Sequence, residues 1–460
     1  MDQPTTTQCL LFPNIFPKPV VAEFDQRQGS SDGGAILLKA ADRRLGLTAA
    51  LADCLEDERQ AGKVEHEMEE MLAQRIYGIA CGYADANDAA RLASDPLHKL
   101  LVGRDPIEGA DLASQPTLSR FENAVDRKQL YRMGERLAER VIERHRRRLQ
   151  GHARRITLDL DPTDDPTHGA QQLSFFNGHY DSWCYLPVLG FLTFNDEREQ
   201  YLFTAVLRPG NTVASVGAVG LLRRILKKLC RAFPGVRIRV RLDGGFAAPE
   251  LLDFLDAQPE VEYVVALAKN AVLERFARPA LRLARRLSKQ TGQTEHVYGE
   301  CLYATKKTWS HRRRVIYKAE VVRQEGKEPK DNPRFVITNL AQTPQWIYER
   351  VYCPRGDIEN RVKELHEGLE IDRTSCTSFW ANQLRVLMTA AAYVLMQEVR
   401  LRAAGTACAR AQVGTLRERL LKLGAHVLRS VRRVVIHLPA SFPWLTSFRQ
   451  IALALGAGSG

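Results

Sequence analysis

The spacing of apolar side chains divides the chain into helical and strand-like stretches. Between residues 31 and 150 they recur at steps of three and four, as in DGGAILLKAADRRLGLTAALADCL and HEMEEMLAQRIYGIACGYADANDAARL. This period predicts amphipathic helices. Residues 1–30 lack it and contain Pro4, Pro13, Pro17 and Pro19. We therefore expect a flexible arm (1–30) followed by a helical domain (31–150).

From residue 151 the pattern changes to that of a sheet. Ile156, Leu158 and Leu160 alternate with polar residues, and 183–194 and 200–210 are two further apolar stretches. Such segments predict strands. A basic amphipathic helix (215–233), a strand from Val236, a helix (248–257) and an apolar strand (261–268) follow. The order predicts a mixed α/β sheet, with an antiparallel meander first and a right-handed helical crossover after its third strand.

The remaining residues predict an interruption and a return to helices. Residues 269–345 are strand-like and basic, which predicts a β-rich insertion subdomain between two parts of a core, 151–268 and 346–400. After the insertion, the spacing of apolar residues predicts a helix over 352–373 and a long, largely buried helix over 378–404. Residues 401–460 predict a basic, helical C-terminal region.

The charge and the cysteines narrow the class of protein. Lys and Arg total 66 against 54 acidic residues, a net charge of +12, which favours a polyanionic partner, with nucleic acid ahead of an anionic membrane. The most apolar run, 387–396, is too short to cross a bilayer, and the start MDQPTTTQ lacks the features of a signal peptide. Nine cysteines stand singly, which argues against a disulfide framework and predicts a reducing cytoplasm.

The stretch YCPRGDIENRVKELHEGLEIDR (352–373) predicts a helix with two stripes. One stripe is apolar and should pack on a core. The other is charged, and a plain ladder of surface ion pairs would give the same pattern. It is formed by residues that share one helix face: Tyr352, Arg355, Glu359, Lys363 and His366.

Carboxylates end two of the predicted strands. Asp161 and Asp243 both stand at a carboxyl end, where ligand sites of open α/β sheets collect. If Asp161 and Asp243 lie close to Glu359, three negative charges meet, and they need protons or cations nearby. Carboxylate oxygens are ligands that suit Mg²⁺. The stretch DLDPTDD holds four acids, so spacing does not decide between Asp159 and Asp161. A strand-ending Asp is also a common turn residue.

Two further stretches are candidates for nucleic-acid contact. ASQPTLSRFENAV predicts a short helix that carries Arg120 beside a tight turn, and this weakly indicates a helix-turn-helix. Trp309 lies among basic residues and could stack on an exposed base, although a Trp in a β subdomain more often belongs to a core. Its basic neighbours include Arg312, Arg313 and Arg314.

These stretches together resemble a known family. YCPRGDIENRVKELH resembles the Y-x-x-R-x-x-x-E-x-x-x-x-x-x-K signature of DDE-type insertion-sequence transposases. The segments LDLDPTDDPTHGAQQ and RLDGGFAAPELLDFL resemble those around the first and second catalytic aspartates. With DGGAILL, SQPTLSRFEN and PRFVITNL, the resemblance spans roughly residues 25–400 and is closest to the insertion sequence 1380 group. The signature's final Lys is His366 here, and Lys363 lies one turn earlier on the stripe.

The resemblance implies an RNase H-like catalytic core interrupted by the insertion, behind a helical N-terminal DNA-binding domain. It implies that Asp161, Asp243 and Glu359 are catalytic and bind two Mg²⁺ ions, with Mn²⁺ as a substitute, and that Tyr352 and Arg355 contact DNA. The implied reaction cleaves double-stranded DNA at terminal inverted repeats and joins the 3′-OH to target DNA. The implied enzyme is a homodimer or larger assembly in the bacterial cytoplasm, at the nucleoid, without membrane attachment.

Two alternatives stay open at this stage. One is an RNase H-like nuclease or resolvase that cuts without joining. The other is a catalytically silent regulator that binds DNA. The signature disfavours the first and the presence of all three acids disfavours the second.

Overall fold

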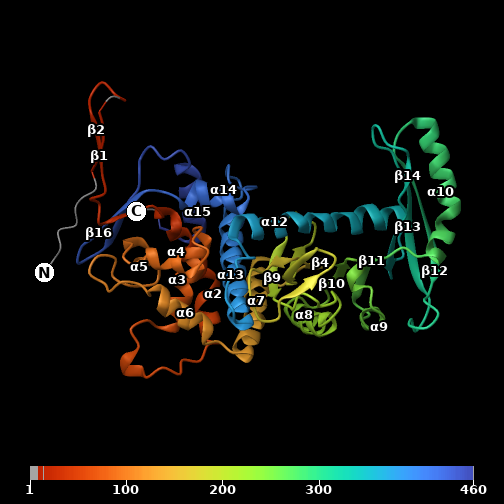
Figure 1. Ribbon diagram of the computed structural model, residues 1–460, viewed down its shortest axis with the longest axis horizontal. Coiled ribbons are helices and arrows are strands. Elements are labelled where there is room, and N and C mark those ends of the chain that lie inside the picture. The colour runs from red at the N-terminus through yellow and green to blue at the C-terminus, as the bar shows by residue number, and fades with distance from the viewer. Residues whose placement is uncertain (1–8, 14, 459–460) are drawn as a thin grey trace.

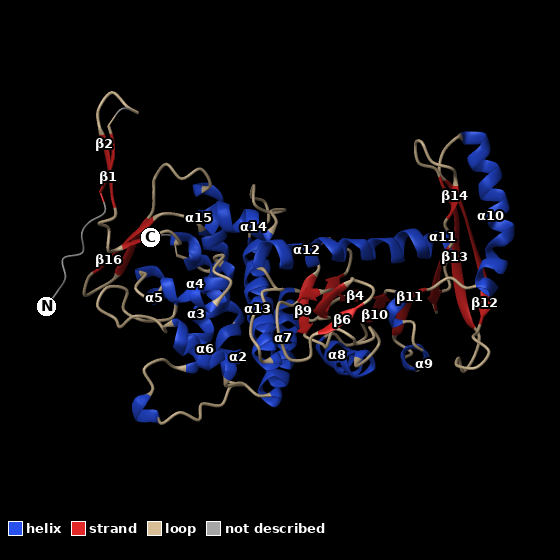
Figure 2. Cartoon of the chain, viewed as in Figure 1, coloured by secondary structure: helices blue, strands red, loops and turns tan. Residues whose placement is uncertain are grey.

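The computed structural model describes residues 9–13 and 15–458. At its centre lies a large mixed sheet with the strand order β12-β13-β15-β11-β10-β4-β8-β9, and β14 pairs with β13. Figures 1 and 2 show this sheet running from β9, beside a helical region, to β12 and β13 at the far end of the molecule. Its strands are β4 (Arg155–Pro162), β8 (Val188–Phe194), β9 (Tyr201–Val206), β10 (Arg237–Leu242), β11 (Val261–Leu267), β12 (Glu295–Tyr303), β13 (Arg313–Val322), β14 (Lys330–Asp331) and β15 (Arg334–Thr338).

The first strands confirm the predicted mixed sheet. β4, β8 and β9 form an antiparallel meander, β10 lies parallel to β4, and β11 lies parallel to β10. The helices α8 (Ala218–Ala232) and α9 (Pro249–Asp256) connect β9 to β10 and β10 to β11. The stretch predicted as one strand over 183–194 is two strands, because Pro187 has no amide hydrogen to continue a ladder. Its first part, β7 (Ser182–Tyr185), pairs with β5 (Asp165–Pro166) and β6 (Phe175–Asn177) in a small separate sheet.

The insertion differs from its prediction in two respects. The helix α10 (Ala271–Thr291) occupies its first part, and Figure 1 shows this helix beside β12 and β13. Its buried Leu273, Ala277, Leu281 and Ala284 have helical spacing, but Pro279 lies inside it and breaks the sequence pattern of a helix. The strands of the insertion also join the central sheet, because β15 pairs with both β11 and β13.

Residues 31–150 fold into helices packed around one long central helix. That helix, α13 (Phe379–Arg402), is buried along nearly its whole length and contacts α1, α3, α6 and α7. The large apolar core runs through these helices and continues into the sheet. The helices are α1 (Ile36–Leu45), α2 (Leu47–Ala52), α3 (Met68–Ala80), α4 (Ala86–Arg91), α5 (Pro96–Leu101), α6 (Gln115–Asn123) and α7 (Arg127–Arg148).

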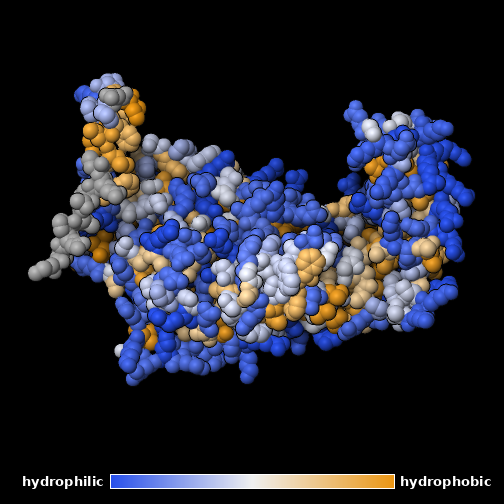
Figure 3. Space-filling model, viewed as in Figure 1, coloured by the Kyte–Doolittle hydropathy of each residue, from blue (hydrophilic) through white to orange (hydrophobic). Residues whose placement is uncertain are grey.

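Short strands occupy both terminal segments. In the predicted arm, β1 (Cys9–Phe12) and β2 (Val20–Glu23) form a hairpin, while residues 1–8 and 14 lie outside the described part. Figure 3 shows apolar side chains on the surface of this hairpin. The C-terminal region, predicted as helical, contains α14 (Val413–Leu416) and α15 (Leu445–Leu455) but also β16 (Ala425–Arg429) and β17 (Val434–His437). Strands of two to five residues are too short for periodicity to reveal.

A buried ion pair joins the two terminal segments. β3 (Gly29–Ser30) pairs with β16, and directly after it the Asp32 carboxylate lies 2.9 Å from Nε2 of His98 and 2.8 Å from Nζ of Lys422. Burial opposes the charge of Asp32, but these two partners outweigh it and lower its pKa. A Cβ on Gly34 would overlap the Leu420 carbonyl oxygen. The DGG stretch is therefore explained by packing between chain ends.

In the described residues no helix is both long and apolar enough to span a bilayer. The cysteines whose side chains are described are all free thiols.

Candidate active site

Two carboxylates converge at one edge of the central sheet. β4 and β10 are parallel neighbours, with Arg241 opposite Asp159, so their carboxyl ends lie side by side. Asp161 lies near the end of β4, and Asp243 directly follows β10, where its side chain accepts a 2.8 Å hydrogen bond from the amide of Gly245. Nη2 of Arg355 pairs with Asp161 and lies 3.8 Å from Oδ2 of Asp243. One guanidinium thus marks the point that both carboxylates face.

Arg355 belongs to a helical segment that lies across this edge. The predicted helix over 352–373 is wrong at its start: a π-helical turn (Ile347–Tyr352) and a 3-10 turn (Cys353–Gly356) precede α12 (Asp357–Leu369). Pro354 explains the change, since it lacks the amide that an α-helical hydrogen bond needs. The predicted apolar stripe is confirmed, because Ile358, Leu365 and Leu369 are buried.

Glu359 lies on the side of α12 that faces β4. Arg355, four residues before it, contacts Asp161, and His366, seven residues after it, lies 3.1 Å from Oγ1 of Thr163 through Nε2. Arg355 precedes α12, but Glu359 and His366 both belong to it, and a spacing of seven residues keeps these two side chains on one helix face. Glu359 itself is exposed. Protein metal sites often bring at least three ligand atoms close together. In the described part, two groups of three such residues have their ligand atoms within 4.8 Å of one another: Asp32, Cys81 and His98, and Asp253, Asp256 and His311. Among the described residues, Asp161, Asp243 and Glu359 do not form such a group, and Glu359 shares its helix face with His366.

The charge of Asp161 is poorly compensated. Burial raises its pKa, Arg355 opposes this, and Asp243 adds to the rise, so that the pKa reaches about 6. Burial of a carboxylate beside another carboxylate is unfavourable unless a cation is present. The environment of Asp161 favours the binding of a further positive charge.

The structure separates Asp159 from Asp161. Asp159 is fully buried and accepts two 2.7 Å hydrogen bonds from Nε and Nη2 of Arg241. Nη1 of Arg241 also donates to the carbonyl of Val351, at 3.1 Å. Asp159 is therefore committed to an ion pair that supports the start of the signature segment, whereas Asp161 reaches the edge.

The other residues of the charged stripe have different surroundings. Tyr352 is half-buried and packs on Tyr348, with ring centroids 5.5 Å apart, and burial raises its pKa. Nδ1 of His366 lies 3.2 Å from the Asp372 carboxylate, so both ring nitrogens of His366 have partners. Lys363 is exposed and lies 3.5 Å from Glu367 one turn later, which is the geometry of a surface ion pair.

The basic residues of the insertion do not form one nucleic-acid surface. Arg313 is buried and pairs with Asp253 and Asp256, so the structure assigns it to the fold. Trp309 packs edge-on against Tyr303 at 5.5 Å, with the guanidinium of Arg313 5.1 Å from its ring centre. The core interpretation of this Trp fits better than base stacking.

The remaining candidates are at least partly exposed. Arg314 pairs with Glu300 and donates to the Gln342 carbonyl at 2.8 Å. Arg312 is exposed on the loop before β13. Arg120 is exposed on α6, where its closest described partner is Oγ1 of Thr117, at 3.2 Å.

The sequence did not single out two residues near the carboxylates. Arg208, just after β9, donates a 2.9 Å bond to the Leu186 carbonyl. Burial lowers its pKa to about 10, against the opposing charge of Asp243. Burial, with the charges of Asp164, Asp161 and Asp243, raises the pKa of Tyr180 to about 12. In the sequence, Arg208 is a basic residue directly after an apolar strand, and this position could have marked it as a candidate.

We expect Asp165 to make stability fall with rising pH. Burial raises its pKa to about 8, and the nearby charges of Asp372 and Asp164 add to the rise. A 2.8 Å hydrogen bond from Oγ1 of Thr374 lowers the pKa but does not cancel this effect. Between its unfolded value and pH 8 the folded chain keeps a proton that the unfolded chain loses. The free energy of unfolding should fall by up to about 1.4 kcal/mol per pH unit from this group.

Urea unfolding of Asp165→Asn at pH 5 and pH 8 tests this expectation. The variant mimics the protonated carboxyl, so it should flatten the decline and be the more stable protein at pH 8. Equal pH slopes for the variant and the parent chain would contradict it.

Comparison with known families identifies the class of protein. Residues 12–457 match the family model described as "Transposase DDE domain group 1". The match covers nearly the whole chain, so the chain belongs to this family of DDE transposases.

Other comparisons add little. No curated protein sequence gives a significant match. Among solved structures, the chain is similar to that titled "Cryo-EM structure of piggyBac transposase synaptic complex with hairpin DNA", at 11% sequence identity and a TM-score of 0.42. That similarity covers 84% of this chain and 78% of the other.

Proposed function

We propose that this DDE transposase moves an insertion sequence. It binds the terminal inverted repeats, cleaves at the ends of the element and joins the freed 3′-OH to target DNA. Membership of the family supports the class of reaction. The observation that carries the proposal for this chain is the convergence of Asp161 and Asp243 on Arg355, beside the helix that bears Glu359. The Y-R-E signature and the likeness to the insertion sequence 1380 group support the kind of element.

The carboxylates fit a divalent metal ion. Asp161 and Asp243 both reach one guanidinium, and the raised pKa of Asp161 shows that this cation does not fully compensate the negative charge. Hard oxygen ligands of this kind suit Mg²⁺, with Mn²⁺ as a substitute. Asp161, Asp243 and Glu359 would hold two ions, which supply charge neutralisation for an in-line displacement at phosphorus.

The residues around the carboxylates have roles that follow from their contacts. The pair formed by Asp159 and Arg241 fixes the end of β4 against Val351. His366 binds α12 to Thr163, which orients Glu359 toward the same edge. Arg355 compensates part of the charge of the two aspartates when no metal ion is bound. Its position on the edge would let it contact a DNA phosphate there. Tyr352 lies half-buried on the same segment and packs on Tyr348.

The basic excess and the family support double-stranded DNA as the partner. The proposed place of action is the bacterial cytoplasm, at the nucleoid. Two element ends must be joined in one event, and this favours a homodimer or a larger assembly. Besides Arg355, the exposed Lys363, Arg312 and Arg120 are candidates for phosphate contacts among the predicted residues.

Incubation with the element's own ends and Mg²⁺, with cleaved and joined products resolved on a gel, tests the proposal. Both cleavage and joining are expected. Cleavage without joining would instead indicate a nuclease or resolvase. Binding without any metal-dependent cleavage would indicate a regulator. A matched DNA with scrambled ends controls for sequence-independent cutting.

Replacement of Arg355 should strengthen metal binding in the absence of DNA. A metal ion at the two aspartates has to displace this guanidinium, so Arg355→Gln removes the competitor. Loss of a competing pair worth about 1.4 kcal/mol corresponds to tenfold tighter binding. Calorimetric titration with Mn²⁺ measures this, and Arg350→Gln, on the exposed side of the preceding turn, is the control. An unchanged or weaker Mn²⁺ affinity in Arg355→Gln would refute the displacement.

A further inference from the structure

A pocket lined by arginines lies among the helices, away from the carboxylates. Its volume is about 540 Å³, which is within the range of ligand sites. Apart from Leu45 and Glu143, every residue that lines it is an arginine. They come from α1, α7 and α13: Arg44, Arg140, Arg144, Arg147, Arg148 and Arg402.

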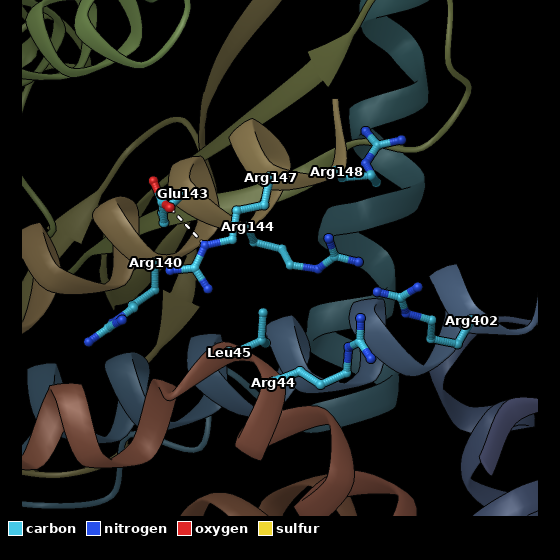
Figure 4. A pocket seen from close by; sticks show the side chains of 8 residues that line it. All are labelled: Arg44, Leu45, Arg140, Glu143, Arg144, Arg147, Arg148 and Arg402. Carbon is cyan, nitrogen blue, oxygen red and sulfur yellow. Dashed lines mark hydrogen bonds and ion pairs between the residues drawn. The ribbon is translucent and has the colours of Figure 1, made fainter. Parts of the chain in front are cut away.

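Three of the guanidinium groups converge in this arginine pocket. Figure 4 shows the side chains of Arg44, Arg144 and Arg402 turned toward one another from three different helices. Burial lowers the pKa of Arg44, and the positive charges of Arg402 and Arg144 lower it further, against Glu398. Like charges held together in this way favour the binding of an anion.

Carboxylates satisfy only part of this charge. Glu398 accepts from Arg144 at 2.7 Å and from Arg402 at 2.9 Å, so one carboxylate serves two arginines. Glu143 is likewise shared, between Arg147 at 2.8 Å and Arg146 at 2.7 Å.

The other arginines differ in their partners. Arg148 has Glu197, at 2.8 Å. In the described part of the chain neither Arg44 nor Arg140 has a carboxylate within ion-pair distance, and Nε of Arg140 is buried without a hydrogen-bond partner. The carboxylates therefore leave guanidinium groups available in the pocket.

Helix ends offer a simpler explanation of the arginines, but not a sufficient one. α1, α7 and α13 all end near the pocket, and basic residues in a last turn compensate the helix dipole. Each end carries about half a negative charge. The three helix ends and the carboxylates Glu143, Glu197 and Glu398 together carry less negative charge than the positive charge of the arginines that line the pocket.

We propose that the arginine pocket is a second anion site, which binds clustered phosphate groups. Guanidinium forks bind phosphate oxygens in pairs, and arginines from three helices surround a compact group of such oxygens. The phosphates come either from a DNA backbone or from a free oligophosphate. The site uses none of the residues at the carboxylate edge, so its existence does not depend on cleavage or joining.

Two double variants of equal charge test the proposal in the full-length protein. Arg44→Gln with Arg147→Gln changes the pocket. Arg43→Gln with Arg146→Gln removes the same charge from the same last turns of α1 and α7, at residues that do not line the pocket. Arg146 also shares Glu143 with Arg147, so both doubles disturb that carboxylate equally. Far-UV circular dichroism checks that both are folded.

Binding of inorganic tripolyphosphate and of duplex DNA is measured for each double. The pocket double should bind tripolyphosphate at least tenfold more weakly, with the control double within twofold of the parent chain. If DNA supplies the phosphates, duplex affinity falls as well, and the salt slope drops by about 0.9 for each lost contact. Weaker tripolyphosphate binding with unchanged duplex binding assigns a free anion instead.

Equal behaviour of the two doubles toward both ligands would overturn the proposal, because bulk charge alone would then explain binding. Failure of the parent chain to bind tripolyphosphate, with equal duplex binding in both doubles, would overturn it too. Cleavage of element ends is scored separately, so failure of the proposed function leaves this result readable.

Discussion

Asp161→Asn, Asp243→Asn and Glu359→Gln are each expected to abolish metal-dependent cleavage of the element ends. Every change removes one anionic oxygen ligand while keeping the size of the side chain. Loss of a ligand at a metal-assisted displacement costs several kcal/mol of transition-state stabilisation, which corresponds to about a thousandfold or more in rate. Cleavage rates at saturating DNA measure the effect, and binding of the ends should change little.

Glu359 has a matched control on its own helix. Glu367 lies two turns later on α12, is exposed and pairs only with Lys363 in the described structure. Glu367→Gln should therefore retain cleavage within a few-fold. Full activity of Glu359→Gln, or an equal loss in Glu367→Gln, would remove Glu359 from the site and leave two aspartates as the candidate ligands.

Asp159→Asn is expected to destabilise the fold strongly. It leaves the guanidinium of Arg241, itself almost fully buried, without its carboxylate partner. Removing one member of a buried pair costs about 3–5 kcal/mol. Urea unfolding at pH 7 measures the loss, and Asp161→Asn, two residues away, should not show it because Asp161 is already poorly compensated.

A double replacement separates the charge effect from packing. Asp159→Leu with Arg241→Met removes both charges and should recover much of the stability lost in Asp159→Asn, as apolar replacements of buried pairs can. The carbonyl of Val351 would still lose its bond from Arg241, so cleavage should stay reduced. Unaltered stability in Asp159→Asn would contradict the assignment of Asp159 to the fold.

Periodicity predicted much of the sheet, because local patterns determine it. Alternation identified β4 and β10, and the helical pattern before β10 predicted a crossover connection. In the structure β10 lies parallel to β4, so Asp161 and Asp243 reach the same edge of the sheet. The same alternation puts Asp159 and Asp161 on one row of β4, so it could not choose between them. That choice needs Arg241, whose position opposite Asp159 depends on strand pairing.

The partners of charged residues were beyond local patterns. The spacing of Arg355 on its stripe is the same whether it contacts a phosphate or, as observed, two aspartates. Arg313 reads as part of a basic run, yet Asp253 and Asp256 on α9 cover it. The arginine pocket likewise combines residues from α1, α7 and α13, which are far apart in the sequence.

Strand β15 connects the insertion to the part of the sheet that carries Asp161 and Asp243. Four residue pairs join β15 to β11 and five join it to β13, and β11 in turn lies beside β10, which leads into Asp243. The insertion is thus continuous with the sheet through backbone hydrogen bonds. Because paired strands tend to open together, we expect the amides of β11 and β15 to exchange with solvent as one cooperative unit.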